Sequence, residues 1–152
     1  MRDLFPDNNF VPPKMGRGLR LVIAEAPGEE ESIKLEPLVG GAGKWFDNAC
    51  RQAGLRRDDL TLANVINCRP PNNLFPTDPP AKSYIKHADG ERAVQHCLKA
   101  HVIPLLESRP WQRVDLLGEK ALRYITGKEG GIFRWRGSPL EIDTEEIKQR
   151  CR

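Results

Sequence analysis

Apolar residues gather in three short runs along the chain, and each run stops at residues that break regular structure. The first run covers residues 19–23 and is followed by Pro27-Gly28. The second covers 60–66 and precedes Pro70, and the third covers 114–117 and ends at a glycine. Short apolar runs bounded by proline and glycine are typical of buried strands. The pattern therefore predicts three strands.

Between and after these runs, apolar residues recur at helical spacing. One such stretch covers 43–54, a second covers 93–106 with Pro104 near its end or kinking it, and a third covers 119–125. Alternating strands and helices are typical of an α/β fold in which helices cover a mostly parallel sheet. In such folds the ligand site lies at the carboxyl ends of the strands.

Length and composition set further limits. The 152 residues suit one compact domain, which we place at 19–152 after an N-terminal arm at 1–18. A net charge of +3 permits contact with phosphate but does not by itself indicate a nucleic-acid binder. No apolar run reaches the roughly 18 residues that span a bilayer, and residues 1–15 lack the apolar core of a signal peptide. We therefore expect a cytoplasmic monomer without a membrane partner.

Three motifs lie at or after the predicted strand ends. They are Ala24-Glu25-Ala26-Pro27-Gly28-Glu29-Glu30-Glu31, the glycine-rich turn at 35–43, and Asn-Val-Ile-Asn-Cys-Arg-Pro-Pro at 64–71. In this order they resemble the motifs of the uracil-DNA glycosylase superfamily, closest to its bacterial and archaeal iron-sulfur branch, and the resemblance covers most of residues 19–140. It implies a three-layer α/β/α sandwich. It also implies a glycosylase that removes uracil or a related deaminated base from DNA in base-excision repair.

Residue roles follow from this chemistry. A glycosylase flips the base out of the stack, binds its edge, and stabilises positive charge on the sugar. Glu25 is the candidate catalytic acid, with Glu31 as a second, while backbone amides near Ala26 suit a base carbonyl. Asn64 offers the donor and the acceptor that pair with uracil. The alternatives are that Glu31 is a surface acid and that Asn64 satisfies backbone groups in a strand.

The sequence departs from the family pattern at two places. Leu38 occupies a position where the family has an aromatic residue, and leucine covers a base without stacking on it. The family also has a His-Pro-Ser-like turn near its C-terminus, whereas His87, His96 and His101 lie too early in the chain to match it. The resemblance thus leads us to expect a C-terminally incomplete domain with a weakened activity or a different lesion as substrate.

The cysteines raise the question of a cofactor. The resemblance implies chemistry that requires none, although the iron-sulfur branch holds a [4Fe-4S] cluster with four cysteines, of which Cys68 and Cys97 match two. Because two thiolates do not make a four-cysteine site, we do not expect a cluster. Cys97 lies on an apolar stripe and Cys50 on an apolar helix face, where buried thiols are common. Cys151, near the C-terminus, is uninformative.

Two segments and two alternative functions remain. Arg134 and Arg136 flank Trp135 in a predicted strand or loop, where they suit DNA phosphate or are ordinary surface residues. The loop insert at 72–89 has no chemistry that we can assign, and contact with DNA or a protein partner is open. One alternative function is a non-catalytic module that binds nucleic acid or protein. Another is a different nucleotide-binding α/β domain, which is disfavoured because neither G-x-G-x-x-G nor Walker A follows the first strand.

Overall fold

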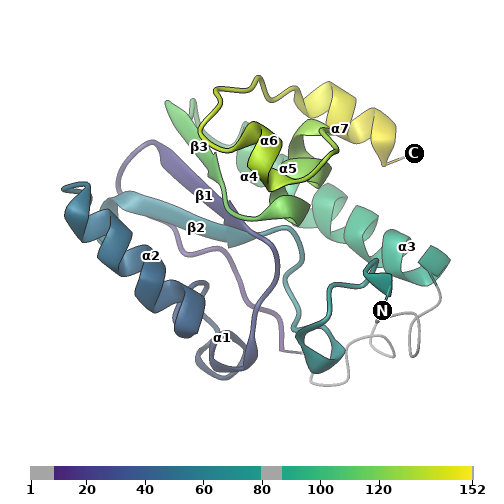
Figure 1. Cartoon of the computed structure of the whole chain (residues 1–152), viewed down its shortest axis with the longest axis horizontal. Helices are drawn as coiled ribbons and strands as arrows, with labels where there is room; N and C mark the ends of the chain where they lie inside the picture. Colours follow the sequence, from purple (N-terminus) through teal and green to yellow (C-terminus); the bar gives the residue numbers. More distant parts are fainter. Residues whose placement is uncertain (1–8, 80–86, 152) are drawn as a thin grey trace.

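The computed structural model describes residues 9–79 and 87–151 (Figure 1). Its centre is a parallel sheet of β1 (Arg20–Ala24), β2 (Leu60–Asn64) and β3 (Arg113–Leu116), in the order β2-β1-β3. Each strand coincides with one of the three apolar runs to within one or two residues at either end. The three predicted strands and their parallel arrangement are therefore confirmed.

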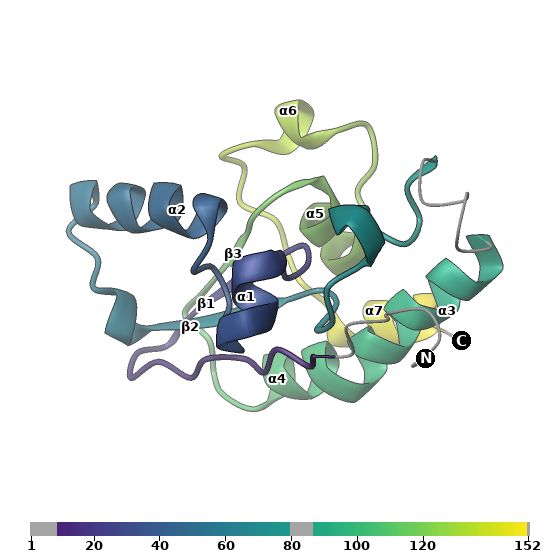
Figure 2. The same ribbon diagram turned by 90° about the horizontal axis from the view of Figure 1, so that it is seen from below.

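Helices cover both faces of this sheet. Figure 2 shows α2 (Gly41–Gln52) and the short α6 (Ile132–Trp135) on one side, with α3, α4 and α7 on the other. The three helices on the second side are α3 (His87–Cys97), α4 (Ile103–Glu107) and α7 (Thr144–Arg150). Two further α-helices are α1 (Glu29–Lys34) and α5 (Glu119–Thr126). The predicted three-layer α/β/α sandwich is confirmed.

Side-chain alternation along β1 separates the two layers. Leu21 and Ile23 are fully buried in the larger core, which also contains the apolar residues of α3, α4, α5 and α7. Val22 and Ala24 point to the opposite face and pack in a second core with Leu38 and Cys50. Because successive side chains of a strand point to opposite faces, one central strand anchors both layers. The prediction that Cys50 is a core residue is confirmed.

The long apolar stripe at 93–106 does not form one regular helix. Between α3 and α4 the backbone widens into a π-helix over Leu98–Val102. Pro104 then lies in the first turn of α4, where its missing amide hydrogen costs little. The proline is thus accommodated by a change in helix type.

Three expectations were wrong or incomplete. The segment with Arg134 and Arg136 was expected as a strand or loop, but Ile132–Trp135 forms a one-turn helix. Cys151 was considered uninformative, yet it is buried in the larger core beside α7. Neither α1 nor α7 was predicted, because each buries only one or two side chains and so shows no apolar period.

The described part of the N-terminal arm lies against β2 and the segment after it. Phe10 pairs with Cys68, and Lys14 pairs with Leu62, in isolated antiparallel bridges. Val11 between them is fully buried. Of the insert at 72–89, residues 80–86 lie outside the described residues. Within 9–79 and 87–151 no helix is long and apolar enough to cross a membrane.

Candidate active site

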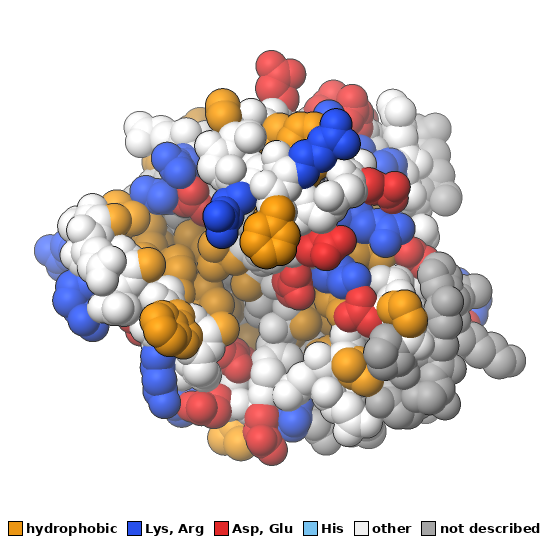
Figure 3. Space-filling view, viewed as in Figure 1, with side chains coloured by type: hydrophobic (Ala, Val, Ile, Leu, Met, Phe, Trp, Pro, Cys, Tyr) orange, Lys and Arg blue, Asp and Glu red, His pale blue; other side chains and the backbone are white. Residues whose placement is uncertain are grey.

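A cavity of about 590 Å³ opens at the carboxyl ends of β1 and β2. Figure 3 shows the hollow on this face, with acidic side chains beside it. Its walls come from the turn after β1, the connection between α1 and α2, the end of β2, and the loop at 70–78. The candidate residues Glu25, Ala26, Glu31, Leu38 and Asn64 all line it. With Leu117, which follows β3, the structure thus brings together five separate segments of the sequence.

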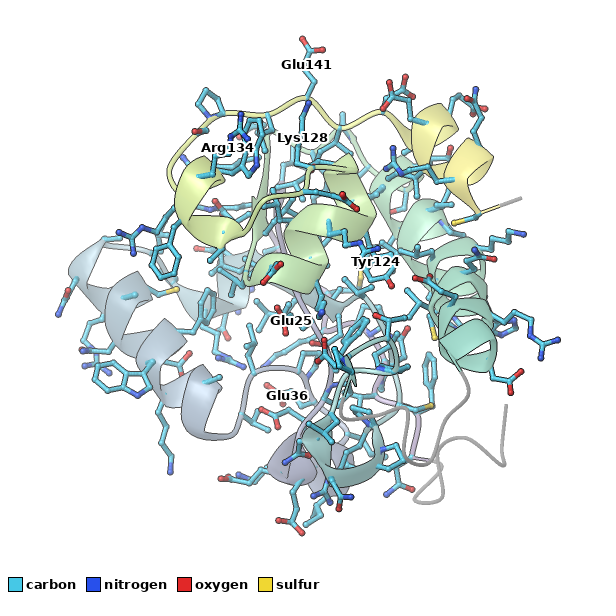
Figure 4. All side chains as sticks on the ribbon, turned by 45° about the vertical axis from the view of Figure 1, so that its right-hand side comes forward. Glu25, Glu36, Tyr124, Lys128, Arg134 and Glu141 are labelled. Carbon is cyan, nitrogen blue, oxygen red and sulfur yellow. The ribbon has the colours of Figure 1, made fainter. Side chains whose placement is uncertain are left out.

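Glu25 is held beneath the N-terminal end of α5 (Figure 4). Its Oε1 accepts a hydrogen bond of 3.0 Å from the backbone amide of Lys120. The amide-rich end of a helix stabilises a carboxylate. A side chain at Gly118 would place its Cβ 2.3 Å from this oxygen, and Gly118 has φ of +95°. Glycine is therefore required at this position for Glu25 to reach α5.

Glu31 has a different environment, because backbone amides surround its carboxylate. Oε2 accepts from Gly28 at 3.1 Å, and Oε1 accepts from Val39 at 3.0 Å and from Gly40 at 2.7 Å. The residue is 8% exposed. One carboxylate thus ties the turn after β1 to the start of α2.

Replacing Glu31 by alanine is expected to lower the free energy of unfolding by roughly 3 kcal/mol, because three amides near the cavity would lose a charged acceptor. Chemical denaturation measures the change. Glu30→Ala is the matched control: Glu30 is the preceding residue on α1 and, in the described part of the chain, makes a single exposed ion pair, with Lys34. We expect that control to change stability by no more than about 0.5 kcal/mol. Equal effects of the two substitutions would refute the anchoring role of Glu31.

Leu38 occupies its place in the cavity wall through an uncommon backbone conformation, with φ of +55°. Arg57 stabilises this turn, since its Nη2 donates to the carbonyl oxygens of Pro37 and Leu38, both at 2.8 Å. Its Nη1 pairs with Asp47 of α2. Sequence analysis missed Arg57, because its distance of 19 residues from Leu38 follows no helical or strand period.

Asn64 ends β2 and is 2% exposed. Its Nδ2 has no hydrogen-bond acceptor among the described residues, although the side chain lines the cavity. By contrast, Nδ2 of the nearby Asn67 donates to the carbonyl oxygen of Val11 at 3.1 Å. A buried donor without an acceptor costs about 1–3 kcal/mol. The cavity therefore contains a donor suited to an acceptor on a ligand.

The described part of the insert forms one wall of the cavity, which sequence analysis did not foresee. Phe75 and Asp78 line the cavity, and Lys120 of α5 makes an ion pair with Asp78. The hydroxyl of Tyr124 lies 3.1 Å from Oγ1 of Thr77. Burial raises the pKa of Tyr124 to about 12, so its hydroxyl remains protonated at neutral pH. These contacts attach the loop to α5.

Acidic side chains predominate in the cavity lining, although three of them pair with cations just outside it: Glu29 with Arg69, Glu30 with Lys34 and Asp78 with Lys120. Five carboxylate side chains line it, and no lysine or arginine does among the described residues; the acids are Glu25, Glu29, Glu30, Glu31 and Asp78. Negative charge disfavours a phosphate inside such a cavity and stabilises a developing cation. The arrangement suits a neutral ring next to a group that becomes positively charged.

The predicted DNA-binding residues lie outside this cavity, and each of them contacts a different aromatic ring. The guanidinium of Arg134 lies 5.3 Å from the ring centroid of Trp135, close to Lys128, which lies over the same ring at 5.4 Å. Figure 4 shows Lys128 and Arg134 together above α6, away from Glu25. Arg136 instead lies 5.6 Å from the ring centroid of Phe133.

Neither His96 nor His101 lines the cavity.

The thiols do not by themselves form a cluster site. Cys68 and Cys97 are neighbours in the core region near the N-terminal segment, and all four cysteines of the chain lie among the described residues. Burial raises the pKa of both thiols and so favours the neutral form over the thiolate that binds metal. Within 9–79 and 87–151 no group of three or more histidine, cysteine, aspartate or glutamate side chains is placed to hold a metal ion. These residues do not fit a [4Fe-4S] cluster.

Comparison with known proteins agrees with this geometry. Residues 17–146 match the family model described as the uracil DNA glycosylase superfamily. A type-4 uracil-DNA glycosylase of Thermotoga maritima is 34% identical over 120 residues, covering 78% of this chain and 55% of the relative. Its counterpart from Archaeoglobus fulgidus is 46% identical over 70 residues, covering 45% and 35%. That of Pyrobaculum aerophilum is 32% identical over 110 residues, covering 71% and 50%. The chain spans about half the length of the curated relatives it matches.

Proposed function

Because this chain belongs to the uracil-DNA glycosylase superfamily, we propose that it removes uracil or a related deaminated base from DNA by hydrolysing the N-glycosidic bond, as a step of base-excision repair. The observation that carries the proposal is that one cavity holds both the buried amide of Asn64, which has no acceptor among the described residues, and the carboxylate of Glu25. The amide of Asn64 suits hydrogen bonding to the edge of a base, and the carboxylate of Glu25 suits stabilisation of positive charge on the sugar.

The base is bound in its flipped-out position. Nδ2 of Asn64 donates to O4 of uracil, and its Oδ1 accepts from N3–H, a pair of contacts that cytosine does not offer. The backbone amide of Ala26 donates to a base carbonyl. Leu38 covers the ring by apolar contact, since it lines the cavity and is nearly buried.

Bond cleavage places positive charge on the sugar. The C1′–N1 bond breaks and the base leaves with the electron pair as an anion; water then adds to the oxocarbenium-like C1′, and the proton that it loses neutralises the base anion. Glu25 stabilises the cation or positions this water. Glu31 acts as a positioning residue, because the amides of Gly28, Val39 and Gly40 occupy its two oxygens. We propose this role for Glu31 instead of the catalytic role that the sequence suggested.

The reaction needs no cofactor, because every group in these steps comes from the chain, the base or water. The partner is uracil-containing DNA, and its phosphates contact Arg134 and Arg136 outside the cavity. The protein acts as a cytoplasmic monomer. One observation favours a second candidate, a module that binds DNA without cleaving it: the cavity has Leu38 where stacking on the base would require an aromatic ring.

The test is an excision assay with labelled oligonucleotides that contain one uracil, single-stranded and double-stranded, followed by alkali to cleave abasic sites. We expect cleavage at the uracil position and none in a matched cytosine oligonucleotide. Binding without cleavage in both strand forms would overturn the proposal in favour of the binding module.

A further inference from the structure

Two large aromatic rings stand exposed on the helices that flank the cavity. Trp45 on α2 is 78% exposed, and Phe133 on α6 is 84% exposed. Aromatic rings contribute most to stability and binding when they are buried, and single exposed rings are common on protein surfaces. These two rings differ from ordinary exposed aromatic residues in two respects: they lie on helices on the same side of the sheet, and each has a cationic side chain next to it.

Trp45 lies on α2 one helical turn after two residues that line the cavity. Gly41 and Ala42 line the cavity, and Trp45 follows them by four and three residues. Residues at these spacings lie on the same face of a helix. The ring therefore stands one turn beyond the cavity opening, next to Lys44.

Phe133 lies on α6, which is on the same side of the sheet as α2. Its neighbours Ile132 and Arg136 line a groove of about 630 Å³. Leu117 lines both this groove and the cavity at the ends of β1 and β2. Two consecutive glycines precede α6, both with positive φ, and the indole of Trp135 donates to the carbonyl oxygen of Glu129 at 2.9 Å. Figures 1 and 2 place α2 and α6 on the same side of the sheet. The exposed ring of Phe133 thus lies on a short helix whose neighbouring residues line this groove.

The cationic side chains next to the two rings have no acidic partner in the described part of the chain. Lys44 and Arg136 make no ion pair with any residue in 9–79 or 87–151, whereas Arg113 and Arg123 near the same helices pair with Asp115 and Glu129. The cavity is lined by carboxylates. Phosphates are therefore attracted to the borders of the opening and repelled from its interior.

We propose that Trp45 and Phe133 stack on bases on either side of the base in the cavity, and that single-stranded DNA is consequently the preferred substrate. Stacking of bases on aromatic rings beside cations is how proteins bind single strands without reading sequence. In a duplex the faces of the flanking bases are already stacked. The inference rests on the proposed function in that DNA is the ligand and one base enters the cavity.

The test measures binding by fluorescence anisotropy with a labelled oligothymidine that lacks uracil, single-stranded or paired with oligoadenine. We expect the single strand to bind at least tenfold more tightly. Trp45→Ala and Phe133→Ala should each weaken single-strand binding about tenfold, with little change for the duplex. Trp45→Phe and Phe133→Tyr should retain binding, because an aromatic face remains. Met15→Ala, at an exposed apolar position on the N-terminal segment, is the matched control.

Excision of uracil from a single-stranded oligonucleotide is measured in parallel, which separates the two proposals. The stacking surface would be overturned if the alanine variants bind single-stranded DNA as tightly as the unmodified protein, or if that protein binds single strand and duplex equally. If the unmodified protein still excises uracil, the proposed function remains intact. Loss of single-strand binding in both alanine variants supports the stacking surface even if no uracil is released. Circular dichroism confirms that each variant is folded.

Discussion

Glu25→Gln is expected to reduce the rate of uracil release by about 10²–10⁴-fold and to leave the free energy of unfolding nearly unchanged. The amide oxygen of glutamine still accepts from the backbone amide of Lys120. What is lost is the negative charge beside the sugar. Two unit charges about 4 Å apart interact by roughly 4 kcal/mol at an effective dielectric constant of 20, which corresponds to about a thousandfold in rate.

Single-turnover excision assays measure this loss, and denaturant unfolding measures the stability. Glu29→Gln is the matched control, because Glu29 lines the same cavity but its side chain is 69% exposed and pairs with Arg69. We expect that control to retain activity within a fewfold. If both variants excise uracil at the original rate, Glu25 is not the catalytic carboxylate. A large loss of stability in Glu25→Gln would instead indicate an anchoring role like that of Glu31.

Asn64→Asp is expected to slow uracil release by about 10²–10³-fold and to lower the preference for uracil over cytosine. Aspartate only accepts hydrogen bonds, so it repels O4 of uracil and accepts from the amino group of cytosine. The present Nδ2 is buried and without an acceptor in the described part of the chain. The change therefore acts directly on the group that we assign to the base edge.

The measurement compares excision rates on uracil and cytosine oligonucleotides. Asn67→Asp is the matched control, because Asn67 is 1% exposed and does not line the cavity. We expect it to lower stability, since its amide no longer donates to the carbonyl oxygen of Val11, without changing the ratio of the two rates. If the ratio is unchanged in Asn64→Asp, base selection depends on other groups.

Much of the architecture was predictable because it depends on local periodicity. The apolar runs at 19–23, 60–66 and 114–117 overlap the three strands, and α2 and α5 overlap two of the stretches with helical spacing. A parallel sheet brings the carboxyl ends of β1 and β2 to one edge. Glu25 and Asn64, which lie at or just after those ends, were therefore expected to meet.

The short elements were not predictable in the same way. α6 has four residues and buries none, so it shows no apolar period, and its segment was expected as a strand or loop. α7 is marked by Asp143, whose side chain accepts from the amide of Glu145, but it buries only Ile147. A helix this short forms because tertiary packing stabilises it, not because of its intrinsic preference.

The sequence by itself determined the sheet, its helical layers, the family, and the two polar groups at the strand ends. Only the tertiary structure decided how the groups are used. Glu25 meets the amide of a residue 95 positions away, and Arg57 meets the carbonyl of a residue 19 positions away. Periodicity shows which face of an element is buried, whereas a hydrogen-bond partner is selected by the packing of distant elements. The free amide of Asn64, the saturated carboxylate of Glu31 and the rings beside the opening follow from that packing.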